Sequence, residues 1–115
     1  MIANELELSK GTEELGLSLS AGQLASMLQY LALIQKWNRT YNLTAIREEE
    51  KVVAYHLMDS LVVLPHLPLG DLIDIGSGAG LPGIPLSIAL PERRVVVLDS
   101  NHKKAAFLNQ AVIEL

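Results

Sequence analysis

The sequence contains no cysteine, so disulfide bonds and thiolate metal sites are excluded. A chain of this kind is typical of the reducing cytosol, and we expect a cytoplasmic protein. The start of the chain lacks the basic segment and apolar stretch of a signal peptide. No apolar run reaches the ~20 residues that a membrane-spanning helix needs, since prolines and polar side chains interrupt residues 57–69. The three histidines are scattered, which argues against a metal site.

Basic residues are also few, because nine Lys and Arg stand against 13 Asp and Glu and give a net charge of −4. A free-standing nucleic-acid binder needs Lys and Arg to contact phosphates, so this balance disfavours that class of protein. An enzyme that meets RNA through one local patch stays compatible with it. The chain is 50% apolar and 19% charged, a composition typical of a globular protein.

Residues 1–69 are predicted to form a helical extension. Ser20 followed by Gln23 matches a capping box, which predicts that a helix begins at Ala21. Apolar residues then recur at helical spacing and predict a core-facing stripe. The stripe consists of Leu24, Met27, Leu28, Leu31 and Ile34.

Turn-forming residues cluster at residues 38–42, and we expect a polar loop there. A further helix is predicted to begin where glutamates crowd at residues 48–50, since negative charge suits a helix N-terminus. Pro65 and Pro68 are expected to end it.

Residues 70–115 change to a pattern of alternating strands and helices. Two short apolar runs, residues 72–75 and 95–99, are predicted as buried strands, and residues 82–90 and 103–115 as helices. This order opens a parallel, Rossmann-like α/β sheet. Two parallel strands do not complete a doubly wound sheet, so we expect an N-terminal portion whose sheet is completed by further sequence or another chain.

The loop after the first predicted strand carries the clearest chemical signal. Its glycines follow a strand and precede a helix, where the chain must turn sharply and where a missing Cβ lets a ligand approach the backbone. Asp99 ends the next strand, 23 residues after Gly76, where a carboxylate is suited to accept hydrogen bonds from ribose hydroxyls. The candidate cofactor-binding residues are Asp74, Gly76, Ser77, Gly78, Gly80 and Asp99.

Two cofactors compete for this loop. Gly78, Gly80 and Gly83 match the dinucleotide fingerprint G-x-G-x-x-G, in which a pyrophosphate lies at the helix N-terminus. Asp74 just before the loop suits the positive groups of S-adenosylmethionine instead. Pro82 removes a backbone N–H that a pyrophosphate would use. The sequence therefore favours S-adenosylmethionine over NAD.

Four stretches of the chain match a known family. They are residues 36–44 (KWNRTYNLT), 56–61 (HLMDSL), 74–85 (DIGSGAGLPGIP), and 98–100 (LDS) with Lys103, Phe107 and Leu108 after it. From about residue 23 onward the chain resembles the bacterial ribosomal RNA small subunit methyltransferase G family, also called glucose-inhibited division protein B. Its members are longer than this chain.

The resemblance implies a class I methyltransferase fold with a helical N-terminal extension. It also implies S-adenosylmethionine as the methyl donor and a guanine N7 of 16S rRNA as the acceptor. By the same resemblance, Gly76 and Leu81 contact the cofactor and Asp99 holds its ribose. Guanine N7 has a free lone pair at neutral pH, so we expect alignment of the reactants and no catalytic base or nucleophile.

His56, Asp59 and Ser60 lie within five residues on one predicted helix, which favours a structural, hydrogen-bonded role over a catalytic triad. Trp37 is expected in the core at a helix end. Possible RNA contacts are Lys36, Arg39, Arg47 and Lys103. Two other functions stay open: an NAD-binding oxidoreductase fragment, and a truncated, non-catalytic protein that binds RNA or a subunit.

Overall fold

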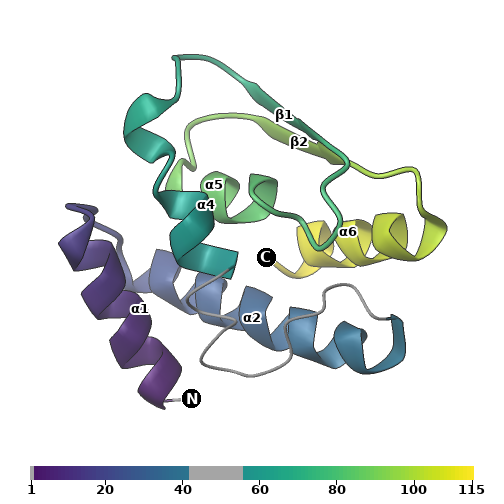
Figure 1. Cartoon of the computed structure of the whole chain (residues 1–115), viewed down its shortest axis with the longest axis horizontal. Coiled ribbons are helices and arrows are strands. Elements are labelled where there is room, and N and C mark those ends of the chain that lie inside the picture. The colour runs from purple at the N-terminus through teal and green to yellow at the C-terminus, as the bar shows by residue number, and fades with distance from the viewer. Residues whose placement is uncertain (1, 42–55) are drawn as a thin grey trace.

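A computed structural model describes the backbone of residues 2–41 and 56–115, and the side chains of residues 6–40 and 56–115. Its elements are α1 (Ile2–Glu14), α2 (Ala21–Tyr41), α4 (Asp59–Leu61), a 3-10 helix (Leu64–His66), β1 (Leu72–Ile75), α5 (Gly83–Ala89), β2 (Val95–Leu98) and α6 (His102–Glu114). Figure 1 shows three layers, with the sheet outermost, α5 and α6 beneath it, and α1 and α2 on the far side. None of the helices in the described ranges is long and apolar enough to cross a membrane.

The sheet consists of β1 and β2, which pair in parallel with Leu72 opposite Val95 and Ile75 opposite Leu98. Helix α5 connects the two strands, which confirms the predicted order of strand, glycine loop, helix, strand and helix. The chain is therefore an α/β protein with a two-stranded parallel sheet in its described part.

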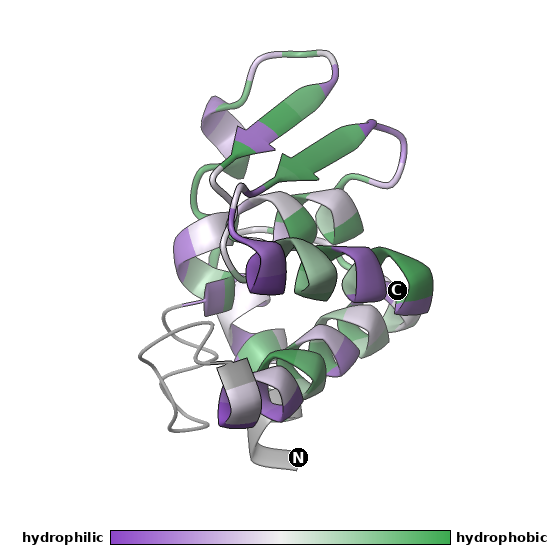
Figure 2. Cartoon of the chain, turned by 90° about the vertical axis from the view of Figure 1, so that its right-hand side faces the viewer, coloured by the Kyte–Doolittle hydropathy of each residue, from purple (hydrophilic) through white to green (hydrophobic). Residues whose placement is uncertain are grey.

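Only one face of this sheet is covered. Side chains alternate along both strands between partly buried and exposed positions, and the exposed ones are apolar. They are Ile73, Ile75, Val96 and Leu98, with exposed fractions of 61%, 76%, 40% and 45%. Figure 2 shows the two apolar strands at the edge of the molecule. Parallel sheets are normally covered on both faces, so this face is suited to further packing.

Helix α2 forms the centre of the core. Met27, Leu31 and Ile34 of the predicted stripe are buried, and Leu24 and Leu28 pack partly buried against them, which confirms the prediction. Two further α2 residues, Tyr30 and Leu33, are also buried, at 0% and 5% exposure. Trp37 packs edge-on against Phe107 of α6, with ring centroids 5.6 Å apart, so its expected core position is confirmed.

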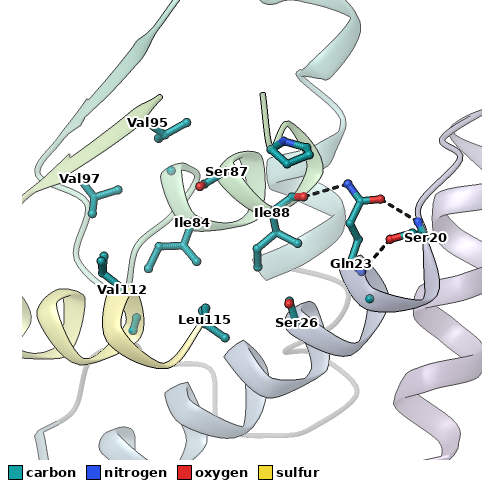
Figure 3. A pocket seen from close by; sticks show the side chains of 14 residues that line it. Ser20, Gln23, Ser26, Ile84, Ser87, Ile88, Val95, Val97, Val112 and Leu115 are labelled. Carbon is teal, nitrogen blue, oxygen red and sulfur yellow. Dashed lines mark hydrogen bonds between the residues drawn. The ribbon is translucent and has the colours of Figure 1, made fainter. Parts of the chain in front are cut away.

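The capping box at the start of α2 is confirmed and has an additional role. The Ser20 N–H donates to Gln23 Oε1 at 2.7 Å, and the Gln23 N–H donates to Ser20 Oγ at 3.1 Å. Gln23 Nε2 also donates to the carbonyl oxygens of Ile88 and Ala89 at 3.0 and 3.4 Å, at the end of α5 (Figure 3). The same side chain thus satisfies donors and acceptors at two helix ends.

The predicted loop at residues 38–42 is wrong for its described part, because α2 continues to Tyr41. Asn38 is buried at 4% exposure, and packing of the preceding turn against α6 outweighs the local turn preference of Asn and Thr. Residues 42–55, which include the predicted start of the next helix at residues 48–50, lie outside the described residues. Helical structure is present at residues 56–61, and Pro65 lies in the following 3-10 helix.

The last two helices begin one residue from their predicted starts. Pro82 is the N-cap of α5, so Pro85 falls in the first turn as expected. Helix α6 begins at His102 because the Asn101 side chain caps it, accepting from the Lys103 and Lys104 N–H groups.

Candidate functional site

The chain bends back on itself directly after β1. Gly76, Gly78 and Gly80 all have positive φ angles, of 77°, 60° and 92°, in the left-handed region where a side chain would be strained. The N–H groups of Gly76 and Ser77 both donate to the Leu98 carbonyl oxygen, at 2.8 and 2.9 Å. The loop is therefore anchored to the carboxyl end of β2.

The four glycines of this region, at positions 76, 78, 80 and 83, have two different structural roles. A Cβ added at Gly76 or Gly78 would meet no atom within 4 Å, so the loop is open at these two positions. A Cβ at Gly80 would collide with the Ile84 side chain, and one at Gly83 with Val97. The first two glycines leave space beside the backbone, whereas the last two permit close packing.

Asp99 lies against the open part of the loop, as the sequence predicted. Its Oδ2 accepts from the Gly78 N–H at 2.8 Å, and its Oδ1 accepts from the Asn101 N–H at 2.9 Å. These two backbone bonds, that of Asn101 first, hold the pKa of Asp99 below its ordinary value. An ionised carboxylate thus lies at the end of β2, and ionised carboxylates are strong acceptors for hydroxyl donors.

Asp74 sits on the inner side of the loop. Its Oδ2 accepts from the N–H of Gly83, the first residue of α5, at 3.0 Å. Its backbone carbonyl accepts from Ser77 Oγ at 2.8 Å. The Asp74 carboxylate therefore already serves as an acceptor for the start of α5.

Gly80 and Leu81 face inward. Gly80 is buried and Leu81 packs partly buried against the core cluster. Their N–H groups both donate to the Ser77 carbonyl oxygen, at 2.9 and 3.0 Å. Of the predicted cofactor residues, the structure brings Gly76, Gly78 and Asp99 together at the open side of the loop.

Tyr30 of α2 contacts the buried side of the loop, and the sequence analysis did not predict this contact. Its hydroxyl donates to the Ala79 carbonyl oxygen at 2.6 Å, and both residues are buried. Burial, and then the negative charge of Asp74, raise the pKa of Tyr30 well above its ordinary value. The two partners are 49 residues apart, so no local spacing pattern links them.

Comparisons with known proteins place the chain in a family. The sequence profile of the rRNA small subunit methyltransferase G (GidB) family matches residues 23–115. The chain belongs to this family. Three relatives, each named ribosomal RNA small subunit methyltransferase G, come from Nitrosospira multiformis, Chromobacterium violaceum and Pseudomonas aeruginosa. They are 61%, 53% and 50% identical to the chain, over 95%, 100% and 95% of its length.

The chain spans about half the length of the curated relatives it matches, namely 50%, 56% and 51% of these three. The match includes the glycine loop, Asp99 and most of α2. In this member of the methyltransferase G family, the elements that form the loop and its anchor therefore lie within the matched region.

His56, Asp59 and Ser60 do not converge as a catalytic triad. Ser60 Oγ donates to the His56 carbonyl oxygen at 2.7 Å, along its own helix, whereas Asp59 is exposed. His56 is buried, and its Nε2 has no hydrogen-bond partner in the structure as described. Ser60 therefore has the hydrogen bond expected of a structural residue, whereas the His56 side chain does not show one at Nε2 in the described part of the chain.

Burial lowers the pKa of His56 below its ordinary value of 6.5. The unfolded chain therefore binds a proton at higher pH than the folded chain, and stability must fall as pH drops through 6.5. We expect the urea midpoint to decrease between pH 7.5 and pH 5.5. His56→Leu should flatten this dependence, whereas His102→Gln, at an exposed position, should retain it. An unchanged slope in His56→Leu would show that other groups cause it.

Three of the four predicted RNA-contacting residues lie on segments at one end of the molecule. Gln29 Nε2 donates to the Glu114 carbonyl oxygen at 3.3 Å, and Trp37 contacts Phe107, so α2 and α6 run antiparallel. The end of α2 therefore lies beside the start of α6 (Figure 1). The exposed Lys36, Arg39 and Lys103 are on these segments, and Arg47 lies outside the described residues.

A hollow of about 800 Å³ lies between α2, α5, β2 and α6 (Figure 3). Gly83, at the start of α5, is among its lining residues. Its lining is mixed, with serines and aliphatic side chains. Ser26, Ser87, Val97, Val112 and Leu115 are among the lining residues. No candidate metal site of three or more His, Cys, Asp or Glu occurs among the residues with described side chains.

Proposed function

We propose that the loop between β1 and α5, together with Asp99, binds S-adenosylmethionine in a class I methyltransferase domain that begins near residue 70. Residues 1–69 would then form its helical extension. The observation that carries this proposal is the 2.8 Å bond from the Gly78 N–H to Asp99 Oδ2, at a loop position with open space beside it. A ribose bound there would find an ionised carboxylate for its hydroxyls and bare backbone alongside.

The contact of Asp74 favours this cofactor over NAD. A pyrophosphate needs free backbone N–H groups at the helix N-terminus. Here the Gly83 N–H at the start of α5 already donates to the Asp74 carboxylate at 3.0 Å. A carboxylate at that point repels phosphate, whereas it attracts the sulfonium and ammonium groups of S-adenosylmethionine.

The proposed reaction is methylation of a guanine N7 in 16S rRNA. When bound, S-adenosylmethionine supplies a methyl group on a positively charged sulfur. Because the N7 lone pair is free at neutral pH, no side chain of this chain has to remove a proton. The residues of the loop and Asp99 then act by orientation, which is a large contribution in reactions between two bound partners.

The basic end formed by Lys36, Arg39 and Lys103 is the proposed contact for the rRNA or the small ribosomal subunit. Asp99 lies three residues before the start of α6, so this end adjoins the proposed cofactor loop. Phosphate contacts by Lys and Arg weaken as salt rises, so binding of rRNA should be salt-dependent. Such an enzyme would act in the cytoplasm, where its substrate is.

Titration calorimetry with S-adenosylhomocysteine and with NAD tests the cofactor. It is run on the chain and on a chimera in which the chain replaces the matching half of the Nitrosospira multiformis relative. We expect binding of S-adenosylhomocysteine only. Binding of NAD alone would support an oxidoreductase, and binding of rRNA with neither cofactor would support a non-catalytic RNA-binding protein.

Asp99→Ala should weaken binding of S-adenosylhomocysteine about 10- to 100-fold, since hydrogen bonds to a charged acceptor are lost. Asp59→Ala is the matched control, because Asp59 is an exposed carboxylate on α4. The dissociation constants come from the same titrations. If the two variants bound S-adenosylhomocysteine with equal affinity, Asp99 would not be part of the binding site.

The acceptor is tested separately, by mass mapping of 16S rRNA from cells with and without the gene. We expect one guanine to lose its methyl group in the deleted strain and to regain it on complementation. Identical rRNA in both strains would refute the proposed substrate without affecting the cofactor.

A further inference from the structure

We propose that Tyr30 is a positioning residue for the cofactor loop, through which helix α2 sets the affinity for the methyl donor without touching it. This inference rests on the proposed function of the loop. It assigns to the helical extension a role in the cofactor site. From the sequence alone, α2 showed only an apolar stripe that faces the core.

The contact is short and fully enclosed. The Tyr30 hydroxyl donates to the Ala79 carbonyl oxygen at 2.6 Å, with the two residues 0% and 4% exposed. A buried carbonyl that loses its donor is left unsatisfied, because no water replaces the lost hydrogen bond. Rotation of the peptide unit after Ala79 away from its present orientation therefore carries a substantial penalty.

Ala79 is the residue at which the loop most needs such a restraint. Its neighbours Gly78 and Gly80 both have positive φ angles, and glycine restricts its own backbone least. The Gly78 N–H is held from the other side by Asp99 at 2.8 Å. The short segment at Gly78 and Ala79 is thus held by two bonds, one to the end of β2 and one to α2.

Helix α2 is itself fixed relative to α5. Gln23 lies seven residues before Tyr30, which is about 10.5 Å along a helix, and its side chain bonds the Ile88 and Ala89 carbonyl oxygens at the end of α5. Tyr30 holds the loop before α5, and Gln23 holds the far end of that helix. The loop, α5 and α2 therefore form one connected unit, and a neutral phenol with a raised pKa keeps its proton to donate.

Tyr30→Phe removes the hydroxyl and keeps the ring in the core. The matched control is Thr12→Val, which removes another buried hydroxyl whose bond, to the Ser9 carbonyl oxygen at 3.0 Å, lies within α1. We expect Tyr30→Phe to weaken binding of S-adenosylhomocysteine about 5- to 20-fold, and Thr12→Val to leave it within about twofold. In the chimera assayed on small ribosomal subunits, KM for the methyl donor should rise by the same factor while kcat changes little.

The outcomes separate the two proposals. If neither the unmutated chain nor the unmutated chimera binds S-adenosylhomocysteine, the proposed cofactor is wrong, and this inference is refuted with it. If wild type binds and Tyr30→Phe binds equally well, only the positioning role is refuted. A second measurement uses the wild-type protein and so does not depend on whether a variant folds. The ¹³Cζ resonance of Tyr30 should shift on saturation with S-adenosylhomocysteine. An unchanged resonance would overturn the inference.

Discussion

Gly78→Val is expected to weaken binding of S-adenosylhomocysteine more than about 100-fold, because both backbone and space are affected. The φ angle of Gly78 is 60°, a conformation that costs a residue with a side chain about 1–2 kcal/mol. The added side chain would enter the open space that we assign to the ligand. Relaxation of the strained loop would also break the bond from the Gly78 N–H to Asp99. Gly76→Val should behave in the same way.

Gly16→Val is the matched control for this experiment. Gly16 also has a positive φ, of 75°, and a Cβ there also meets no atom within 4 Å. The two valines thus introduce similar strain at different places, and only the one at Gly78 adjoins Asp99. Titration calorimetry should find near-wild-type affinity for Gly16→Val. Wild-type affinity in both loop variants, Gly76→Val and Gly78→Val, would show that the loop is only a turn.

Gly83→Ala is expected to destabilise the fold by about 1–3 kcal/mol, the usual cost of overpacking a well-filled contact. A Cβ at Gly83 would collide with the Val97 side chain and lie 3.0 Å from Asp74 Oδ2. Helix α5 would have to move off the sheet, and the bond from the Gly83 N–H to Asp74 would lengthen. Urea unfolding of wild type and variant measures this loss.

Gly22→Ala is the matched control for Gly83→Ala, because the same substitution is expected not to destabilise the fold at this position. Gly22 lies in the first turn of α2, and the nearest atom to an added Cβ is Ser20 Oγ at 3.8 Å. Alanine is favoured over glycine in a helix by about 1 kcal/mol where nothing obstructs it. We therefore expect Gly22→Ala to be neutral or stabilising. If both variants were equally stable, α5 would not sit as closely on β2 as the structure has it.

Features with short sequence spacing were predictable. The capping box at Ser20 and Gln23 depends on a three-residue interval, and the structure contains both of its hydrogen bonds. The strand order and the position of Asp99 beside the loop follow from parallel strands whose carboxyl ends meet at one edge. These inferences need only local pattern and chain direction.

Features that depend on packing between distant segments were not predictable. The end of α2 was expected to be a loop because Asn and Thr favour turns, yet burial against α6 keeps it helical. Tyr30 and Ala79 meet only because α2 crosses beneath the loop. The bond from Gly83 to Asp74 likewise depends on where α5 rests on the sheet, which no spacing in the sequence specifies.

Amide chemical-shift mapping during titration with S-adenosylhomocysteine tests most directly whether the bend after β1 holds the methyl donor. The N–H groups of Gly78 and Asn101 both donate to the Asp99 carboxylate, so a ligand that takes up this carboxylate must disturb them. We predict that the largest shifts occur at Gly76, Gly78 and Asn101. The assignment would be contradicted if saturation left these three amides unmoved, or if it moved only residues such as Ser26 and Leu115, which line the hollow between α2 and α6.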